Sequence, residues 1–184
     1  MSRLPKLDRA DMTPEQGRVA DEIFATRGIG GGPFGVWLHS PELADRAQKL
    51  GAFARYHTGV DKRLSELVIL VTARLWTAQF EWAVHEDEAR KAGLAEHVIA
   101  DLRAGRRPEL RDDEAVIYDF VHELYATRTM SQPTYDRAMA LLGQTALVEL
   151  VAIIGYYGFI AMTLNVFDCD TPDGSKPLAP VPGL

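Results

Sequence analysis

The sequence has a single cysteine, Cys169, among its 184 residues. One thiol cannot form an intramolecular disulfide, a C-x-x-C redox pair or a cysteine-rich zinc site. A single unpaired thiol is typical of proteins from reducing compartments, so we expect a cytoplasmic location. The sequence around Cys169 assigns it no role.

Basic residues are also fewer than acidic ones. The 20 Lys and Arg residues stand against 26 Asp and Glu, which gives a formal net charge of −6. Such a surface repels phosphate backbones, so we expect no nucleic-acid partner. Charged residues make up 25% and apolar residues 47% of the chain, a globular composition that excludes disorder as the main state.

Sustained alternation of apolar and polar residues, the pattern of half-buried strands, is missing as well. Apolar residues recur instead at helical spacing between helix-start and helix-end signals. We therefore expect an all-α, single-domain helical bundle over residues 1–184, because this length is too short for two well-packed domains. Its core should span about residues 35–167, with an extended proline-rich tail at 171–184 lying along the surface or along a neighbouring subunit.

Helices are predicted where a capping residue precedes a helical apolar pattern. They are expected from Thr13 to about Gly28, from Ser40 to about His57, from Asp61, from Thr77 to Gly93, from Ala95 to Arg103, from Asp112 to Thr127, from Ser131 to Gly143 and from Thr145 to Phe167. The helix after Ser40 should bury Leu43, Ala47, Leu50 and Ala54. Residues 34–38 are expected to form a short apolar segment outside any helix.

One apolar stretch is long enough to cross a membrane. Residues 146–164 contain a single charged residue, Glu149. The stretch has no Lys or Arg close to either end and lacks aromatic belts, so we interpret it as a central core helix and expect no membrane partner. The residues after Met1 do not have the apolar run of a signal peptide.

The best candidate for chemistry lies on the helix after Thr77. Ala78, Glu81, Trp82 and His85 share one helical face, and Glu81 and His85 are an i,i+4 pair within hydrogen-bonding reach. A carboxylate beside an imidazole raises its pKa and produces a general acid or base for neutral pH. The same pair is also common on solvated helix faces, so spacing alone leaves both interpretations open. Two such ligands do not make a metal site, so we expect no metal ion here.

Glu66 is the second candidate, because it stands among apolar residues on a helix that is apolar on most sides. A buried carboxylate needs a partner. That partner is either a cation such as Arg63 or Arg74, in a structural salt bridge, or His85 across the helix pair.

The order and spacing of Glu66, Ala78, Glu81 and His85, followed by Ala89 and Gly93-Leu94, resembles the carboxymuconolactone decarboxylase-like superfamily, which includes the alkylhydroperoxidase D-like proteins. The resemblance covers about residues 35–165. It implies the all-α fold of that superfamily and a homo-oligomer, a trimer or hexamer. Apolar surface on the helices after Thr77 and over residues 146–164 also favours self-association.

In the hydroperoxidase branch two cysteines occupy the positions that here hold Ala78 and Glu81. Disulfide-cycling peroxidases need a thiolate that attacks peroxide and a second thiol that resolves the sulfenic acid. The chain therefore resembles the thiol-free, decarboxylase-type branch. This resemblance implies a cofactor-free lyase or related proton-transfer enzyme for a small cyclic or aromatic-derived acid, as in aromatic compound catabolism. His85 would act as the acid/base, supported by Glu66 and Glu81.

Residues 32–41 also resemble a G-P-F-x-x-W/L-x-x-S-P segment near the site mouth of family members. On this basis Phe34, Trp37, Trp82 and Tyr156 are the candidate substrate-binding residues, although aromatic residues at helical spacing are more often core than pocket. Two alternative functions stay open. They are a peroxiredoxin-like peroxidase, disfavoured by the missing cysteine pair, and a non-catalytic small-molecule-binding protein.

Overall fold

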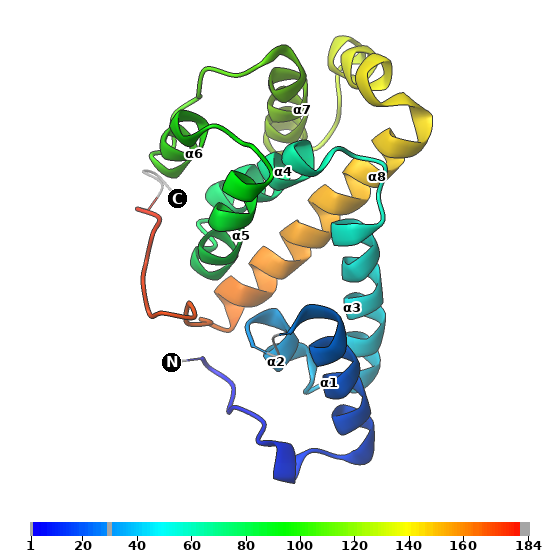
Figure 1. The fold of residues 1–184 in the computed structure, drawn as a ribbon, viewed down its shortest axis with the longest axis vertical. Helices are drawn as coiled ribbons and strands as arrows, with labels where there is room; N and C mark the ends of the chain where they lie inside the picture. The colour runs from blue at the N-terminus through cyan, green and yellow to red at the C-terminus, as the bar shows by residue number, and fades with distance from the viewer. Residues whose placement is uncertain (1, 29–30, 181–184) are drawn as a thin grey trace.

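The fold is given by a computed structural model, which describes residues 2–28 and 31–180. Within these ranges the chain is helical and contains no strand, which confirms the all-α prediction (Figure 1). The elements are η1 (Arg9–Asp11), α1 (Pro14–Arg27), α2 (Pro33–Trp37), α3 (Pro41–Tyr56), α4 (Lys62–Leu75), α5 (Gln79–Lys91), α6 (Glu96–Arg103), α7 (Asp112–Thr127) and α8 (Gln132–Val166).

Helices α4 and α8 form the centre of the bundle. Helix α4 packs against α5, α6, α7 and α8, and every residue from Leu64 to Arg74 is buried, as expected for a helix that is apolar on most sides. Helix α8 runs diagonally through the molecule, with α3 along one side and α1 and α2 near its C-terminal end (Figure 1). The site residues thus lie on or beside the best-packed elements.

Two of the predicted helix starts have the expected side-chain caps. Thr13 and Gln16 form a reciprocal capping box, with the Thr13 hydroxyl accepting from the Gln16 amide and the Gln16 side chain accepting from the Thr13 amide. Asp61 accepts hydrogen bonds from the amides of Arg63 and Leu64 at the start of α4. These caps fix where α1 and α4 begin.

The prediction that Thr77 caps the next helix is wrong. Thr77 has a left-handed φ of 49° and lies in the turn after α4, while Ala78 is the N-cap residue of α5 and makes no side-chain cap. The amide of Ala78 donates to the Ala73 carbonyl at 2.8 Å, which closes a tight connection between α4 and α5. This short turn holds the two helices side by side.

Two further predictions about the N-terminal half are wrong. Residues 33–37 form a short helix, α2, that starts at Pro33, a residue whose fixed φ favours a first helical position. In α3, Leu43 and Leu50 are 43% and 49% exposed. The buried face of α3 consists of small residues and a glutamine: Ala44, Ala47, Gln48, Gly51 and Ala54. Small side chains let the neighbouring helices approach α3 closely.

Helix α8 combines the last two predicted helices, and the predicted break at Gly143 is a kink with φ 72° and ψ 174°. By length and composition α8 is the one described helix apolar enough to cross a membrane, with a mean hydropathy of 1.9 over an 18-residue window. Of that window, 61% is buried inside the molecule, which is what the core helix of a bundle shows.

The described part of the tail lies along the start of α5, on the outside of the bundle (Figure 1). Leu178 is 2% exposed, and its backbone amide and carbonyl both bond to the Gln79 side chain, at 2.9 and 2.8 Å. Arg74 donates to the Ala179 carbonyl at 2.9 Å. Residues 171–180 contain no helix or strand, and residues 181–184 lie outside the described part.

Candidate active site

Glu66 of α4 and His85 of α5 face each other across the helix pair. The Nδ1 atom of His85 lies 2.7 Å from Oε2 of Glu66, and the two residues are 2% and 0% exposed. Of the two partners that the sequence left open for Glu66, the structure therefore brings together Glu66 and His85. The other carboxylate oxygen of Glu66 accepts from Nζ of Lys62 at 2.5 Å.

Neither of the arginines considered as partners for Glu66 contacts it. Arg63 forms ion pairs with Asp113 and Glu114 of α7, and Arg74 bonds to the tail. The Arg63 pairs tie the start of α4 to the start of α7. They therefore belong to the framework of the bundle and leave Glu66 to His85.

Glu81 contacts the opposite side of the same imidazole. Its Oε1 atom lies 2.9 Å from Nε2 of His85, one helical turn away on α5, and Glu81 is only 4% exposed. The ring of Tyr157 meets the imidazole edge to face, with centroids 5.2 Å apart. His85 is therefore held between two carboxylates, and both of its ring nitrogens have an anionic partner.

This arrangement shifts the pKa values of the two residues in opposite directions, down for Glu66 and up for His85. Burial favours a neutral Glu66, but the hydrogen bonds and charges of His85 and Lys62 outweigh it and lower the pKa of Glu66 to about 2. Burial likewise lowers the pKa of His85, but the charge of Glu81 and the bonds from Glu66 and Glu81 raise it above the usual value of 6.5. Both shifts favour the charged forms, an imidazolium at His85 and a carboxylate at Glu66.

The raised pKa of His85 predicts a pH-dependent stability. A proton held more tightly in the folded state stabilises it fully below the unfolded-state value of 6.5, and this contribution is lost as pH rises through the folded-state pKa. We expect the stability advantage of the wild type over His85→Gln to shrink at alkaline pH in urea unfolding series. An advantage that stays constant from about pH 5 to about pH 10 would contradict the assignment.

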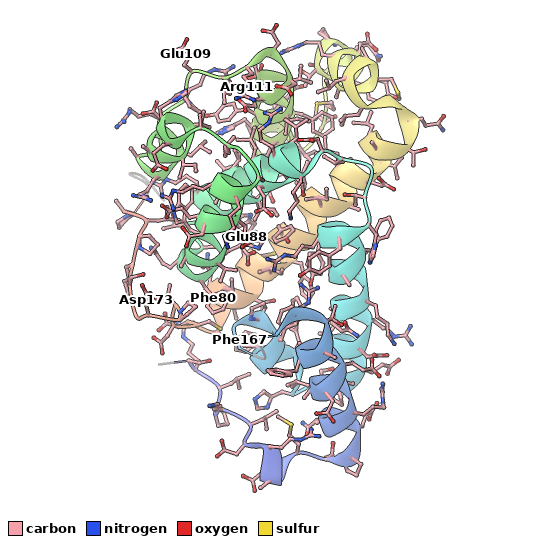
Figure 2. All side chains as sticks on the ribbon, viewed as in Figure 1. Phe80, Glu88, Glu109, Arg111, Phe167 and Asp173 are labelled. Atoms are coloured by element: carbon pink, nitrogen blue, oxygen red, sulfur yellow. The ribbon has the colours of Figure 1, made fainter. Side chains whose placement is uncertain are left out.

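A small cavity of about 30 Å³ lies beside His85, where α1, α2, α3, α5 and α8 come together. Its walls include Arg27, Phe34, Arg55, Phe80, Glu81 and His85. Phe80 lies at the end of α5 nearest α2 (Figure 2). A Cβ atom at Gly32 would lie 2.4 Å from the Phe80 ring, so glycine is required for the start of α2 to come this close to α5.

Of the four aromatic residues predicted to bind substrate, the structure brings Phe34 to this cavity. Trp37 donates to the Thr163 hydroxyl at 3.1 Å and stacks on Phe159 behind Phe34. Trp82 is fully buried, and its indole nitrogen donates to Glu86. It does not line the cavity, which lies on another side of α5. Trp37 and Trp82 are thus packed in the core, the interpretation that helical spacing also allowed.

Tyr156 is 3% exposed and packs against α3 without lining the cavity. A Cβ atom at Gly51 would lie 2.0 Å from the Tyr156 hydroxyl oxygen and 2.7 Å from a terminal nitrogen of Arg27. Gly51 therefore provides the space in which these two groups meet. Their positions next to the cavity depend on the absence of a side chain at residue 51.

Substitution of Gly51 tests this packing. We expect Gly51→Ala to lower the free energy of unfolding by about 1–3 kcal/mol, because the added methyl group overpacks a rigid buried tyrosine. Gly31→Ala is the matched control, since a Cβ atom there meets nothing within 4 Å. Urea unfolding compares the two variants, and equal stabilities would show that Gly51 has no packing role.

Sequence reasoning missed several wall residues. Arg27 and Arg55 come from α1 and α3, far from the α5 motif, and no spacing rule connects them to it. Phe80 and Val84 could have been predicted from the sequence, because positions 80, 81, 84 and 85 form one helical stripe. Each lies directly before a predicted site residue on α5, Phe80 before Glu81 and Val84 before His85.

The comparisons with known proteins concern the family and the fold. The model of the carboxymuconolactone decarboxylase family matches residues 41–115, a segment that contains Glu66, Glu81 and His85. No curated protein matches the sequence. Residues 41–115 thus match the family that the sequence resemblance named.

Two solved structures have the same fold. One is an alkylhydroperoxidase AhpD core, an uncharacterized peroxidase-related protein from Ralstonia eutropha JMP134, with a TM-score of 0.77 and 15% identity over 94% of this chain and 93% of that one. The other is an uncharacterized peroxidase-related protein from Silicibacter sp. TM1040, with a TM-score of 0.71 and 11% identity over 91% and 90%. At these identities the likeness concerns the fold.

Proposed function

We propose that the protein is a cofactor-free lyase, or a related proton-transfer enzyme, that acts on a small cyclic or aromatic-derived acid. The observation that carries the proposal is the buried imidazole of His85 between Glu66 and Glu81, at the wall of a cavity. The positions that would hold a redox cysteine pair are occupied by Ala78 and Glu81. The site is thus equipped to move protons and not to cycle a disulfide.

In this mechanism the substrate loses CO2, and the electron pair of the broken bond is left as an enolate. A proton delivered to the carbon atom that lost CO2 then converts the enolate into the product. Nε2 of His85 already bonds to Glu81, so the imidazolium proton passes to Glu81 and then to the substrate. Glu66 holds Nδ1 throughout and stabilises the charged ring, which regains its proton from water.

A second candidate is a peroxidase, because both solved structures of the same fold are described as peroxidase-related. The only thiol, Cys169, argues against it. Cys169 lines a separate cavity of about 500 Å³ with Leu4, Val36 and Leu38, and none of the residues lining that cavity lines the His85 cavity. Burial raises the pKa of the Cys169 thiol, which disfavours the reactive thiolate.

Turnover of a substrate panel tests the proposal. The wild-type protein is assayed for CO2 release from lactone acids and aromatic-derived acids and, in parallel, for hydroperoxide consumption with a thiol reductant. The lyase assignment predicts CO2 release and no thiol-dependent peroxide consumption. Peroxide reduction that is lost in Cys169→Ser would favour the peroxidase. Binding of panel members without turnover would favour a non-catalytic binding protein.

We also propose that the chain forms a homo-oligomer through α8. Val148, Val151, Met162 and Val166 are 67%, 48%, 44% and 57% exposed and follow one side of α8. Helix α5 does not contribute the apolar surface expected from the sequence, because its Phe80 and Trp82 are buried within the chain. A second copy of the chain would cover the exposed side of α8.

Sedimentation velocity tests this assembly. We expect a species well above 20.4 kDa for the wild type and a shift toward the monomer for Val148→Lys combined with Val151→Lys. A stable 20 kDa wild-type species would contradict it. A cytoplasmic location, a place in aromatic compound catabolism and the lack of nucleic-acid or membrane partners stay predictions from the sequence.

A further inference from the structure

Two arginines at the wall of the His85 cavity have few partners of their own. Arg27, the last residue of α1, donates to the Gln48 carbonyl at 3.2 Å and lies over the Phe34 ring, 4.6 Å from its centroid. Its Nε atom is buried without a hydrogen-bond partner. Among the described residues no carboxylate lies within ion-pairing distance of Arg27. Its charge is therefore left without an anion.

Arg55 of α3, unlike Arg27, has one carboxylate nearby, but at a long distance for an ion pair. Its side chain is 15% exposed, and the nearest carboxylate oxygen, from Glu88, lies at 3.8 Å. Glu88 is shared with Lys91, which approaches it at 2.8 Å. The Nε atom of Arg55 is also buried and unbonded. A charged group taken out of water is costly unless it is paired, so both guanidinium groups favour an incoming anion.

The carboxylates of the site do not fill this role. Glu66 is bonded to Lys62 and His85, and Glu81 is bonded to His85. The two carboxylates thus bond to cations of their own, and neither bonds to Arg27 or Arg55. The hydroxyl of Tyr156, buried without a partner close to Arg27, is a third polar group at this place that lacks a bond.

We propose that Arg27 and Arg55 form an anion-binding subsite that holds a carboxylate of the ligand beside His85 and selects acids over neutral molecules of the same shape. A guanidinium group matches a carboxylate with two parallel hydrogen bonds. The cavity of about 30 Å³ suits a group of carboxylate size. The ring of a cyclic acid exceeds this volume, so its binding has to displace part of the apolar wall of Pro33, Phe34 and Phe80.

This subsite deepens the proposed function and rests on it in assigning the bound acid as the substrate. Arg55 lies within the segment matched by the family model, but Arg27 comes from α1, outside residues 41–115. The subsite therefore adds to the matched Glu66, Glu81 and His85 a specificity-determining residue from the N-terminal part of this chain.

Binding of benzoate, with benzamide as its neutral counterpart, tests the subsite in the full-length protein. Affinity is measured by titration calorimetry at low salt, with the imidazole NMR signals of His85 as a local reporter. We expect benzoate to bind and to perturb His85, and benzamide to bind at least about tenfold more weakly. Equal binding of the two ligands, or no binding of benzoate, would overturn the proposal.

Three variants assign the effect to residues. Arg27→Gln and Arg55→Gln are each expected to weaken benzoate binding at least about tenfold, and Arg27→Lys should weaken it less. Arg46→Gln is the matched control, because Arg46 lies on α3 but is exposed and paired with Glu42. Unchanged affinity in both glutamine variants, with thermal unfolding showing that they are folded, would overturn the subsite, as would an equal loss in Arg46→Gln.

The subsite and the lyase assignment fail separately. If benzoate binding depends on Arg27 and Arg55 but no acid in the panel releases CO2, the subsite stands and the lyase function falls. If CO2 is released and depends on His85, but benzoate binding ignores both arginines, the lyase function stands and the subsite falls. The binding measurement needs no turnover, so neither result hides the other.

Discussion

His85→Gln should lower the turnover of the acid substrate by about 10²–10⁴-fold, the usual contribution of a positioned general acid or base. Glutamine keeps approximate size and hydrogen-bonding capacity but cannot hold a transferable proton near neutral pH. The loss should appear in kcat more than in KM, because the imidazole contacts Glu66 and Glu81 and the carboxylate of the ligand is assigned to other groups. Steady-state CO2 release measures both constants.

The matched control is His97→Gln. His97 is exposed on α6 and contacts only the Glu109 carbonyl among its described partners. Its substitution should leave turnover unchanged. Turnover of His85→Gln within a factor of about two of the wild type would remove His85 from the chemistry, since a factor of two corresponds to less than about 0.5 kcal/mol.

Glu66→Ala should lower the free energy of unfolding by about 3–5 kcal/mol, the range for removing one member of a buried ion pair. Glu66 is 0% exposed and is the anionic partner of both Lys62 and His85. Without it the imidazolium keeps only Glu81, and a cavity opens inside α4, the central helix. Chemical unfolding of the variant at neutral pH measures the loss.

Glu42→Ala is the control for this loss. Glu42 also forms an i,i+4 ion pair, with Arg46, but both side chains are exposed to more than 70%. Exposed pairs of this kind contribute little, so its stability should match that of the wild type. If Glu66→Ala were as stable as Glu42→Ala, the carboxylate of Glu66 would not hold the α4–α5 pair together.

The sequence predicted the parts of the site that depend on local spacing. The Glu81–His85 contact follows from a four-residue interval on one helix, and the expected burial of Glu66 made His85 one of its candidate partners across the helix pair. The wall residues Arg27 and Arg55 could not be found this way. Their approach to His85 depends on how α1 and α3 pack, which no interval in the sequence encodes.

The incorrect predictions have a common physical origin in tertiary packing. The buried face of α3 was predicted from its leucines, but close approach of the neighbouring helices selects Ala44, Ala47 and Gly51, and turns Leu43 and Leu50 outward. Likewise, Trp82 shares a helical face with His85 by spacing, yet the cavity lies on the side of α5 that carries Phe80 and Glu81. A helical face is broad, and only the packed neighbours decide which edge of it meets a pocket.

The central claim is that His85 and Glu81 deliver a proton to a carbon atom from which CO2 has departed. The most direct test is turnover in D2O of the acid identified in the substrate panel, with the product analysed by NMR. The account predicts a single deuteron at the carbon that carried the carboxylate, on one face only, because the enzyme-held proton exchanges with solvent. A product without deuterium at that carbon, or one labelled equally on both faces, would contradict it.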